Sequence, residues 1–273
     1  MKSGRLLALC SLLLMSPLSR ADQAALPLWE AGLAGININQ LAYPGSDHIV
    51  RRNFVLPYLV YRGDILRADR SNVGLRALKT DRLELDVGFA GALGSSDGDI
   101  AVRNGMADLG TLIELGPRLR WTLSENLFGA RLRADFPLRA VFDIEDRFKH
   151  SGFSFEPGLV SDITTDSGTF YSFNVSSVFG SEKLSDYFYQ VTPADVTAQR
   201  PLFDAKAGLI ALRTGFTVGK KFSDKWRGFG FARYEWTTPA KNADSPLIVA
   251  NGGWSFGLGA TYIWAQSTQT VTD

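Results

Sequence analysis

The chain has 273 residues, with 29 basic and 28 acidic side chains, two histidines and one cysteine. This balance excludes the strongly basic surface that nucleic-acid binding requires, and so few histidines and cysteines leave little to hold a transition metal. Residues 97–99, Asp-Gly-Asp, are typical of a turn rather than of a calcium loop. We expect one large all-β domain without a cofactor or a bound metal.

The first 21 residues have the features of a secretory signal peptide. Lys2 and Arg5 precede an apolar run over residues 6–15, and a small-x-small pattern predicts cleavage after Ala21. The run is about half of the ~20 residues that a membrane-spanning helix needs. Cys10 lies inside it, so the mature chain is predicted to have no thiol, and it has two more acidic than basic residues.

Apolar side chains then recur at every second position, which is typical of strands. In the clearest segment, residues 254–264, the large side chains share one face and the other face is small and uncharged. Elsewhere charge marks the second face, as in residues 82–89, 113–121 and 128–139. A soluble sandwich or lipocalin-like barrel would need a further layer to cover about ten apolar faces, whereas a barrel in lipid needs none.

The connections support the same architecture, because short polar turns alternate with long loops. The short turns are predicted at Ser124–Asn126, Thr164–Ser167 and Ser223–Lys225, and the long loops within residues 95–108, 140–150, 180–203 and 239–252. We predict an antiparallel transmembrane β-barrel over residues 22–264, followed by a periplasmic tail, residues 265–273. Eleven segments show the strand pattern, and a hairpin turn at residues 69–72 would give twelve strands; ten is the alternative.

The two faces of the strands predict two sets of residues. The lipid-facing aromatic side chains are Trp121, Trp254, Phe256, Tyr262 and Trp264, with Trp and Tyr at the headgroups. The predicted lumen charge cluster consists of Glu84, Asp86, Arg118, Arg120, Arg131 and Arg133. This cluster is either a constriction that selects small solutes or a lattice of ion pairs that fills a narrow barrel, and we favour the lattice because buried charges must be paired.

Enzymatic and loop functions have weaker signals. His48 and His150 each have a serine nearby in sequence, but neighbours in sequence rarely form a catalytic triad, so we expect no catalytic residue and no hydrolase activity. Tyr187, Phe188 and Tyr189 follow one another on a long loop. They are candidates either for a protein contact outside the barrel or for a plug that folds into the lumen.

Several blocks outside the periodic pattern carry a family resemblance. They are LAYPGSD (residues 41–47), PYLVY (57–61), NGMADLGTLIELG (104–116), SDYFYQV (185–191) before DAKAG (204–208), and NADSPLI (242–248) before the last strand. In this order they resemble the MltA-interacting protein family, also called the MipA/OmpV family. The resemblance spans nearly the whole mature chain.

This resemblance implies a location in the outer membrane of a Gram-negative bacterium and a scaffold role. The implied partners are a murein lytic transglycosylase and a murein synthase, both enzymes of peptidoglycan. A narrow pore for small solutes and a surface adhesin are the alternatives. With both termini in the periplasm, the partner would bind the short turns and the tail rather than the long loops.

Overall fold

The computed structural model describes residues 26–63, 66–68, 73–92 and 100–271. The signal segment with Cys10 and the Asp97-Gly98-Asp99 turn lie outside the described residues. No helix in the described part of the chain combines the length and the apolar composition needed to cross a membrane.

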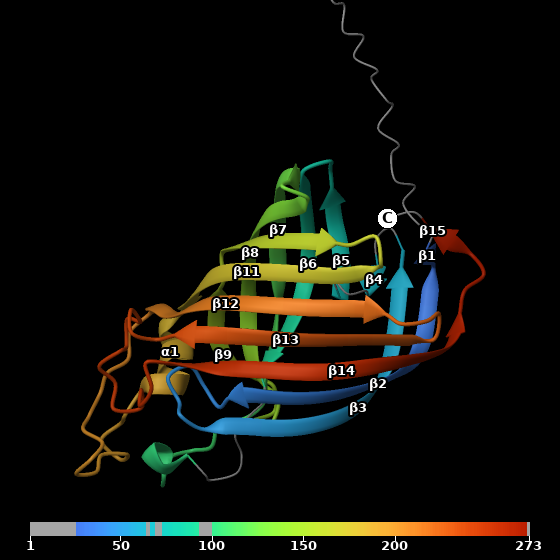
Figure 1. Cartoon of the computed structure of the whole chain (residues 1–273). Helices are drawn as coiled ribbons and strands as arrows, with labels where there is room; N and C mark the ends of the chain where they lie inside the picture. The colour runs from blue at the N-terminus through green and yellow to red at the C-terminus, as the bar shows by residue number, and fades with distance from the viewer. Residues whose placement is uncertain (1–25, 64–65, 69–72, 93–99, 272–273) are drawn as a thin grey trace, which may run out of the picture.

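A single antiparallel sheet closes on itself to form a barrel (Figure 1). Its strands are β2 (Trp29–Leu41), β3 (Ile49–Arg62), β4 (Leu66–Ala68), β5 (Val73–Lys79), β6 (Leu83–Ala92), β7 (Leu112–Leu127), β8 (Ala130–Asp143), β9 (Lys149–Phe155), β10 (Gly158–Thr164), β11 (Thr169–Gly180), β12 (Gly208–Lys221), β13 (Trp226–Trp236) and β14 (Gly252–Gln266). Successive strands pair with each other except β9 and β10, and β14 pairs with β2. The predicted antiparallel barrel is confirmed.

Two of the predicted strands are interrupted. β9 and β10 lie end to end, because both pair with β8 on one side and with β11 on the other, and they are separated at Glu156–Pro157. β4 and β5 form a hairpin in which Ala68 opposes Val73. The turn predicted at residues 69–72 lies outside the described residues, and the number of strands that cross the membrane stays a prediction.

The turn predicted at Ser124–Asn126 is wrong. β7 continues to Leu127, which pairs with Ala130, and the chain reverses at Phe128 and Gly129. Both turn residues have positive φ, 54° and 85°, as a two-residue hairpin of type I′ requires. The polar residues 124–126 suggested the turn, but its position is determined by Gly129, which readily adopts a positive φ.

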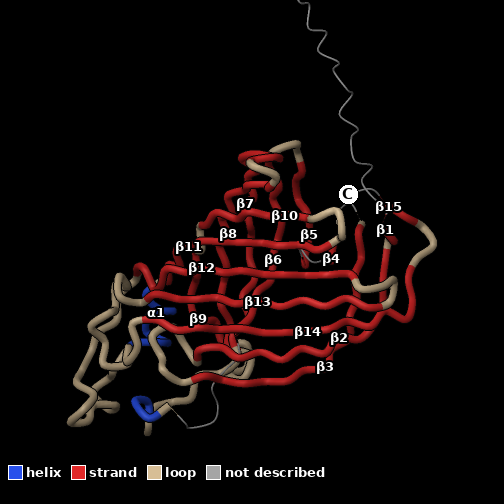
Figure 2. The backbone as a smooth tube through the Cα atoms, in the orientation of Figure 1, coloured by secondary structure: helices blue, strands red, loops and turns tan. Residues whose placement is uncertain are grey.

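The two ends of the barrel differ, and we call them the turn end and the loop end (Figure 2). The turn end has the short connections and both termini of the described chain, where β1 (Leu26–Pro27) pairs with β15 (Thr270–Val271). The predicted tail is therefore held against the N-terminal segment. The loop end carries the longer connections, with the helices η1 (Ala101–Arg103) and α1 (Glu182–Tyr189).

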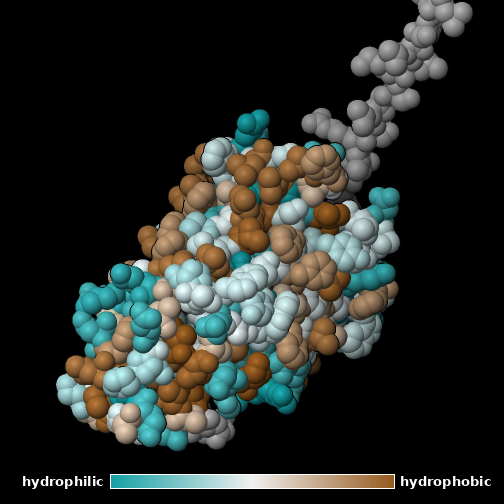
Figure 3. Space-filling model, turned by 60° about the vertical axis from the view of Figure 1, so that its left-hand side comes forward, coloured by the Kyte–Doolittle hydropathy of each residue, from teal (hydrophilic) through white to brown (hydrophobic). Residues whose placement is uncertain are grey.

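Many large apolar side chains are exposed on the outside of the barrel wall, and Figure 3 shows hydrophobic patches among paler side chains on one face of it. All five aromatic residues predicted to face lipid are exposed there, namely Trp121, Trp254, Phe256, Tyr262 and Trp264. Neighbouring strands bring aromatic rings together, with 5.0 Å between the ring centroids of Trp226 and Tyr262. An apolar surface of this extent is stable in lipid rather than in water.

Candidate functional site

The lumen between β6 and β7 contains a compact group of ion pairs. The register places Asp86 opposite Arg118 and Glu84 opposite Arg120. Asp86 is fully buried and accepts hydrogen bonds from Nε and Nη2 of Arg118 at 3.2 and 3.1 Å, and its Oδ2 lies 2.8 Å from Nη2 of Arg120. Glu84 lies 3.6 Å from the same guanidinium. These four predicted residues thus form one charge-paired group, as buried ions must.

The other two predicted lumen residues lie elsewhere. Arg133 pairs with Asp135 and with Asp162, an acidic partner that the sequence analysis did not single out. Arg131 lies close to the turn end, where its half-exposed side chain is 3.4 Å from Glu125. The structure therefore separates the predicted cluster into three sets of contacts.

A second ionic network lies nearer the loop end. Arg213 binds Glu235 at 2.8 Å and Glu156 at 3.3 Å, and Arg139 binds Glu114 at 3.4 Å. The sequence analysis did not identify this network. Glu156 could have been noticed, because it stands in an otherwise apolar or small stretch directly before Pro157, where the strand breaks.

A third group of charges lies on one wall of the lumen toward the turn end. Glu30 is fully buried, with its carboxylate 2.6 Å from Arg227 and 3.3 Å from Arg62. Arg227 also donates to the hydroxyl of Tyr58 at 3.1 Å. The sequence analysis missed this group because its members come from β2, β3 and β13, which are far apart in the sequence.

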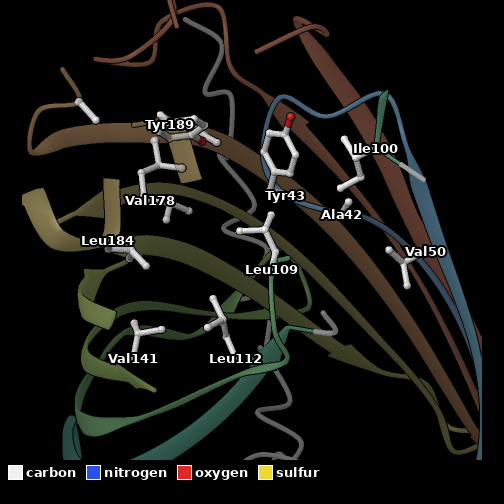
Figure 4. Close-up of a cluster of buried hydrophobic side chains, with 13 residues drawn as sticks. Ala42, Tyr43, Val50, Ile100, Leu109, Leu112, Val141, Val178, Leu184 and Tyr189 are labelled. Atoms are coloured by element: carbon white, nitrogen blue, oxygen red, sulfur yellow. The ribbon is translucent and has the colours of Figure 1, made fainter. Parts of the chain in front are cut away.

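The loop end is closed by an apolar core, which we call the plug. Four loops and several strand ends contribute to it, as Figure 4 shows for Tyr43, Ile100, Leu109 and Tyr189 above Val141. The rings of Tyr43 and Tyr189 meet edge to face, 6.5 Å apart. Beneath the plug a cavity of about 70 Å³ reaches the loop-end ionic network, which leaves room for several water molecules.

Hydrogen bonds join the plug loops to one another. Tyr43 donates to the carbonyl of Leu247 at 2.6 Å, and Tyr189 donates to the carbonyl of Pro44 at 3.0 Å. Arg103 lies over the Tyr43 ring, 5.7 Å from its centroid, and donates to the carbonyl of Phe188 at 2.9 Å. The loops therefore hold each other in place across the barrel mouth.

The aromatic segment predicted on a long loop belongs to this plug. Tyr189 is fully buried, and Tyr187 and Phe188 pack against the core. Tyr187 also donates to Asp143 at 2.8 Å. Burial raises the pKa of Tyr43 to about 12, and it raises the pKa of both Tyr187 and Tyr189. The inward packing of Tyr189 is what a plug requires, and a protein contact through the half-buried Tyr187 and Phe188 stays a prediction.

The turn end presents an apolar projection, the β7–β8 hairpin. β6 accompanies β7 only as far as the pair Leu83–Trp121, so the hairpin extends beyond its neighbour. Its tip carries Leu123, Leu127 and Phe128, and Phe128 is 99% exposed. A bulky residue with positive φ is strained, and a ring that is 99% exposed gains almost no packing from the described residues to offset that strain.

The two histidines show no catalytic arrangement. The ring of His150 packs between Phe142 and Phe153, with centroids 5.5 and 4.8 Å away. The backbone NH of His48 donates to the hydroxyl of Ser46, which is the hydrogen bond of a local turn. Within the described residues, no three acidic or histidine side chains gather in a way that could hold a metal ion.

Comparison with known proteins agrees with this architecture. Residues 32–264 match the family model described as MltA-interacting protein MipA. Among solved structures, the chain is similar to an outer membrane channel from Pseudomonas putida F1, with 13% sequence identity and a TM-score of 0.39. The alignment covers 89% of this chain and 98% of that chain. It is also similar to a loop-deletion mutant of OmpT, an outer membrane protein of Vibrio cholerae, with 9% identity, 87% and 100% covered, and a TM-score of 0.35. No curated protein matches the sequence significantly.

Proposed function

Because the chain belongs to the MltA-interacting protein MipA family, an outer-membrane β-barrel family, we propose that it is a scaffold for peptidoglycan enzymes. In this proposal the turn end faces the periplasm and binds a murein lytic transglycosylase. The barrel holds that enzyme at the outer membrane, where a murein synthase joins the assembly. The chain itself catalyses no reaction.

The observation that carries the proposal is the tip of the β7–β8 hairpin. Phe128 is almost completely exposed beside Leu127, at the end of the barrel where the other connections are short. Aromatic side chains, phenylalanine included, are enriched in protein–protein interfaces relative to the rest of the surface. The tip is small, so we expect a modest and transient interface, near or below about 1,200 Å².

The closed loop end favours a scaffold over a pore. The plug core joins loops from several sides of the mouth, and ion pairs occur in the lumen near the turn end, in the middle and near the loop end. A solute would have to displace these contacts in order to pass.

Capture of a purified lytic transglycosylase by the detergent-solubilised barrel tests the proposal. Phe128→Ser should weaken capture at least tenfold. Phe148→Ser is a matched control, because Phe148 is also exposed, 63%, and has a similar positive φ of 58°, but lies in a turn at the loop end. This control should bind as the wild type does.

Three other results would contradict the proposal. Loss of capture with Phe148→Ser alone would show that the sides of the barrel are assigned wrongly. Equal capture by both variants would remove the hairpin tip from the interface, and the turn at residues 222–225 with Trp226 and the tail would be the next surfaces to test. If the wild type captures no transglycosylase, the scaffold proposal fails.

A further inference from the structure

A polar patch lies on the outer wall of the barrel, over β2 and β3 toward the loop end. It consists of Asn37, Asn39, Arg51 and Asn53. Side chains that oppose each other on paired antiparallel strands point to the same side of the sheet. Asn37 is opposed on one side by Leu258 of β14, which is 68% exposed on the outer face, and on the other side by Asn53 of β3. The patch therefore lies on the surface that faces lipid, and Figure 1 shows β14, β2 and β3 side by side.

The three asparagines of the patch satisfy one another only in part. Asn39 donates to the side-chain oxygen of Asn37 at 2.7 Å, and Asn37 donates to that of Asn53 at 2.8 Å. This chain of hydrogen bonds ends at the side-chain NH₂ group of Asn53, which is exposed and donates to no group among the described residues. Hydrocarbon offers a polar group no partner. The exposed end of the amide chain therefore needs an acceptor from the membrane.

Arg51 gives the patch a positive charge. It is opposed by Asn39, which is in turn opposed by Phe256 on the outer face of β14, so Arg51 points outward as well. Arg51 is exposed, and no acidic group of the described residues lies within ion-pair distance of its guanidinium. The lumen arginines differ in this respect, since Arg118 and Arg213 have carboxylate oxygens at 3.1 and 2.8 Å. Arg51 is thus an outward cation without a partner in the described part of the chain.

Trp254 marks the level of the lipid headgroups beside the patch. Tryptophan and tyrosine are enriched at membrane interfaces, and the ring of Trp254 lies 5.0 Å from that of Tyr234 on the outer face. Phe256, at the level of Arg51, is two residues deeper, which is roughly 7 Å along the strand at ~3.4 Å per residue. An arginine side chain can span this distance, with its stem in the apolar layer and its charge at the headgroups. Asn53 lies two residues deeper again, below the headgroups.

The outer face of β3 becomes apolar beyond the patch. Toward the turn end it continues with Val55 and Leu59, which are 74% and 67% exposed, and Leu33 of β2 lies beside them at 45%. From the loop end inward, this surface thus offers a cation, amide donors and then hydrocarbon. The neighbouring outer face of β14, within residues 254–264, has no charged side chain. A membrane lipid presents the complementary groups in the same order: phosphate, ester carbonyls and acyl chains.

We propose that the outer faces of β2 and β3 bind an anionic phospholipid from the membrane leaflet at the loop end. The guanidinium of Arg51 binds the phosphate, and the amide of Asn53 donates to an ester carbonyl beneath it. The acyl chains lie along Val55 and Leu59. A lipid fits better than a protein partner because charge, amide and hydrocarbon follow one another from the headgroup level into the bilayer. This site goes beyond the scaffold proposal, and it does not depend on which side of the membrane the loop end meets.

Native mass spectrometry of the folded barrel in detergent micelles tests the site. The probes are dioleoyl phosphatidic acid and dioleoyl phosphatidylcholine, which share their acyl chains and differ in net charge. We expect the barrel to retain one phosphatidic acid molecule at a concentration at which retention of phosphatidylcholine is at least fivefold lower. Arg51→Gln should lower the retained phosphatidic acid at least fivefold. Arg147→Gln, which removes the same charge from an exposed turn at the loop end, is the matched control and should stay within twofold of the wild type.

Each result decides for or against the site. Asn53→Leu keeps the charge and should lower the retained phosphatidic acid at least twofold, and heat-modifiable migration on a detergent gel shows that each variant is folded. Equal losses in Arg51→Gln and Arg147→Gln would assign the binding to the overall charge of the loop end and overturn the proposal. Equal retention of the two lipids by the wild type would overturn it as well. A dimer of barrels that Asn53→Leu dissociates would show that a second copy covers the patch, which also contradicts a lipid site.

Discussion

The loop end and the turn end of this barrel are built in opposite ways. At the loop end, aromatic side chains from separate loops are buried against one another and joined by hydrogen bonds, as Tyr43 and Tyr189 show. At the turn end, the connections are short and Phe128 extends into solvent. One end is closed by its own side chains, and the other leaves an apolar group for a partner. The proposed scaffold function depends on this difference.

Opening the plug should have the largest effect. Tyr43→Ala with Tyr189→Ala removes a ring contact and two hydrogen bonds between loops, so a barrel that is silent in a planar bilayer should begin to conduct. Single-channel recording measures this change. Leu202→Ala, at an exposed site in the same loop as Tyr189, is the control and should remain silent.

A different result in the same recording would favour the pore. Steady conductance of the wild type, shifted when Arg118 and Arg131 are made neutral, would mean that these lumen charges control a permanent passage. The closed loop end would then be a selective filter, and the contrast between the two ends would no longer support a scaffold.

Breaking the ion pairs near the turn end should have the next largest effect. Glu30→Gln leaves Arg62 and Arg227 buried without their carboxylate, which should lower the free energy of unfolding by about 3–5 kcal/mol. Glu125→Gln, at an exposed pair with Arg131, should cost at most about 1 kcal/mol. Urea unfolding in detergent micelles compares the two, and equal losses would show that Glu30 is less isolated from water than its burial indicates.

The alternation of apolar and polar residues predicted most strands, because a strand between lipid and lumen must alternate. It placed the clearest segment, residues 254–264, inside β14, Gly252–Gln266. It failed at the β7–β8 turn, where φ rather than polarity determines the position. The contact of Asp86 with Arg118 and Arg120 could be predicted from the sequence, because these residues lie on strands that follow one another in the chain and pair in the sheet.

Other parts of the site were beyond the sequence pattern. Glu30 meets Arg227 only because β14 closes the barrel against β2, so their contact depends on the last strand as well as the first. The plug depends on loops without periodicity, and Tyr187 to Tyr189 are equally compatible with a solvent-exposed loop.

Removing a helix cap should have a local effect. Ser181 Oγ accepts from the backbone NH of Leu184 at 3.4 Å, and from that of Phe153 at 3.0 Å. Ser181→Ala should destabilise α1 by about 1 kcal/mol, so its amides should exchange several-fold faster. Ser223→Ala removes a similar bond to the NH of Trp226 in an exposed turn, and its exchange effect should stay confined to that turn. Faster exchange at both ends in either variant would show that the ends are coupled.

Alkaline pH should loosen the plug alone, and by the smallest amount. Burial raises the pKa of Tyr43 from an ordinary value near 10 to about 12, so the neutral hydroxyl is favoured in the folded state. The associated stability is fully present below pH 10 and is lost as the pH rises toward 12, because the unfolded chain releases the proton first. At pH 10 the loss from this one group is roughly a few tenths of a kcal/mol, since half of the unfolded tyrosine is ionised there.

Hydrogen exchange of the plug amides between pH 9 and 10.5, corrected for the intrinsic rate, should rise more steeply in the wild type than in Tyr43→Phe, which keeps the ring and has no proton to lose. The turn-end amides are the internal reference, and a pH slope that Tyr43→Phe leaves unchanged would assign the effect to Tyr187 or Tyr189, whose pKa values burial also raises.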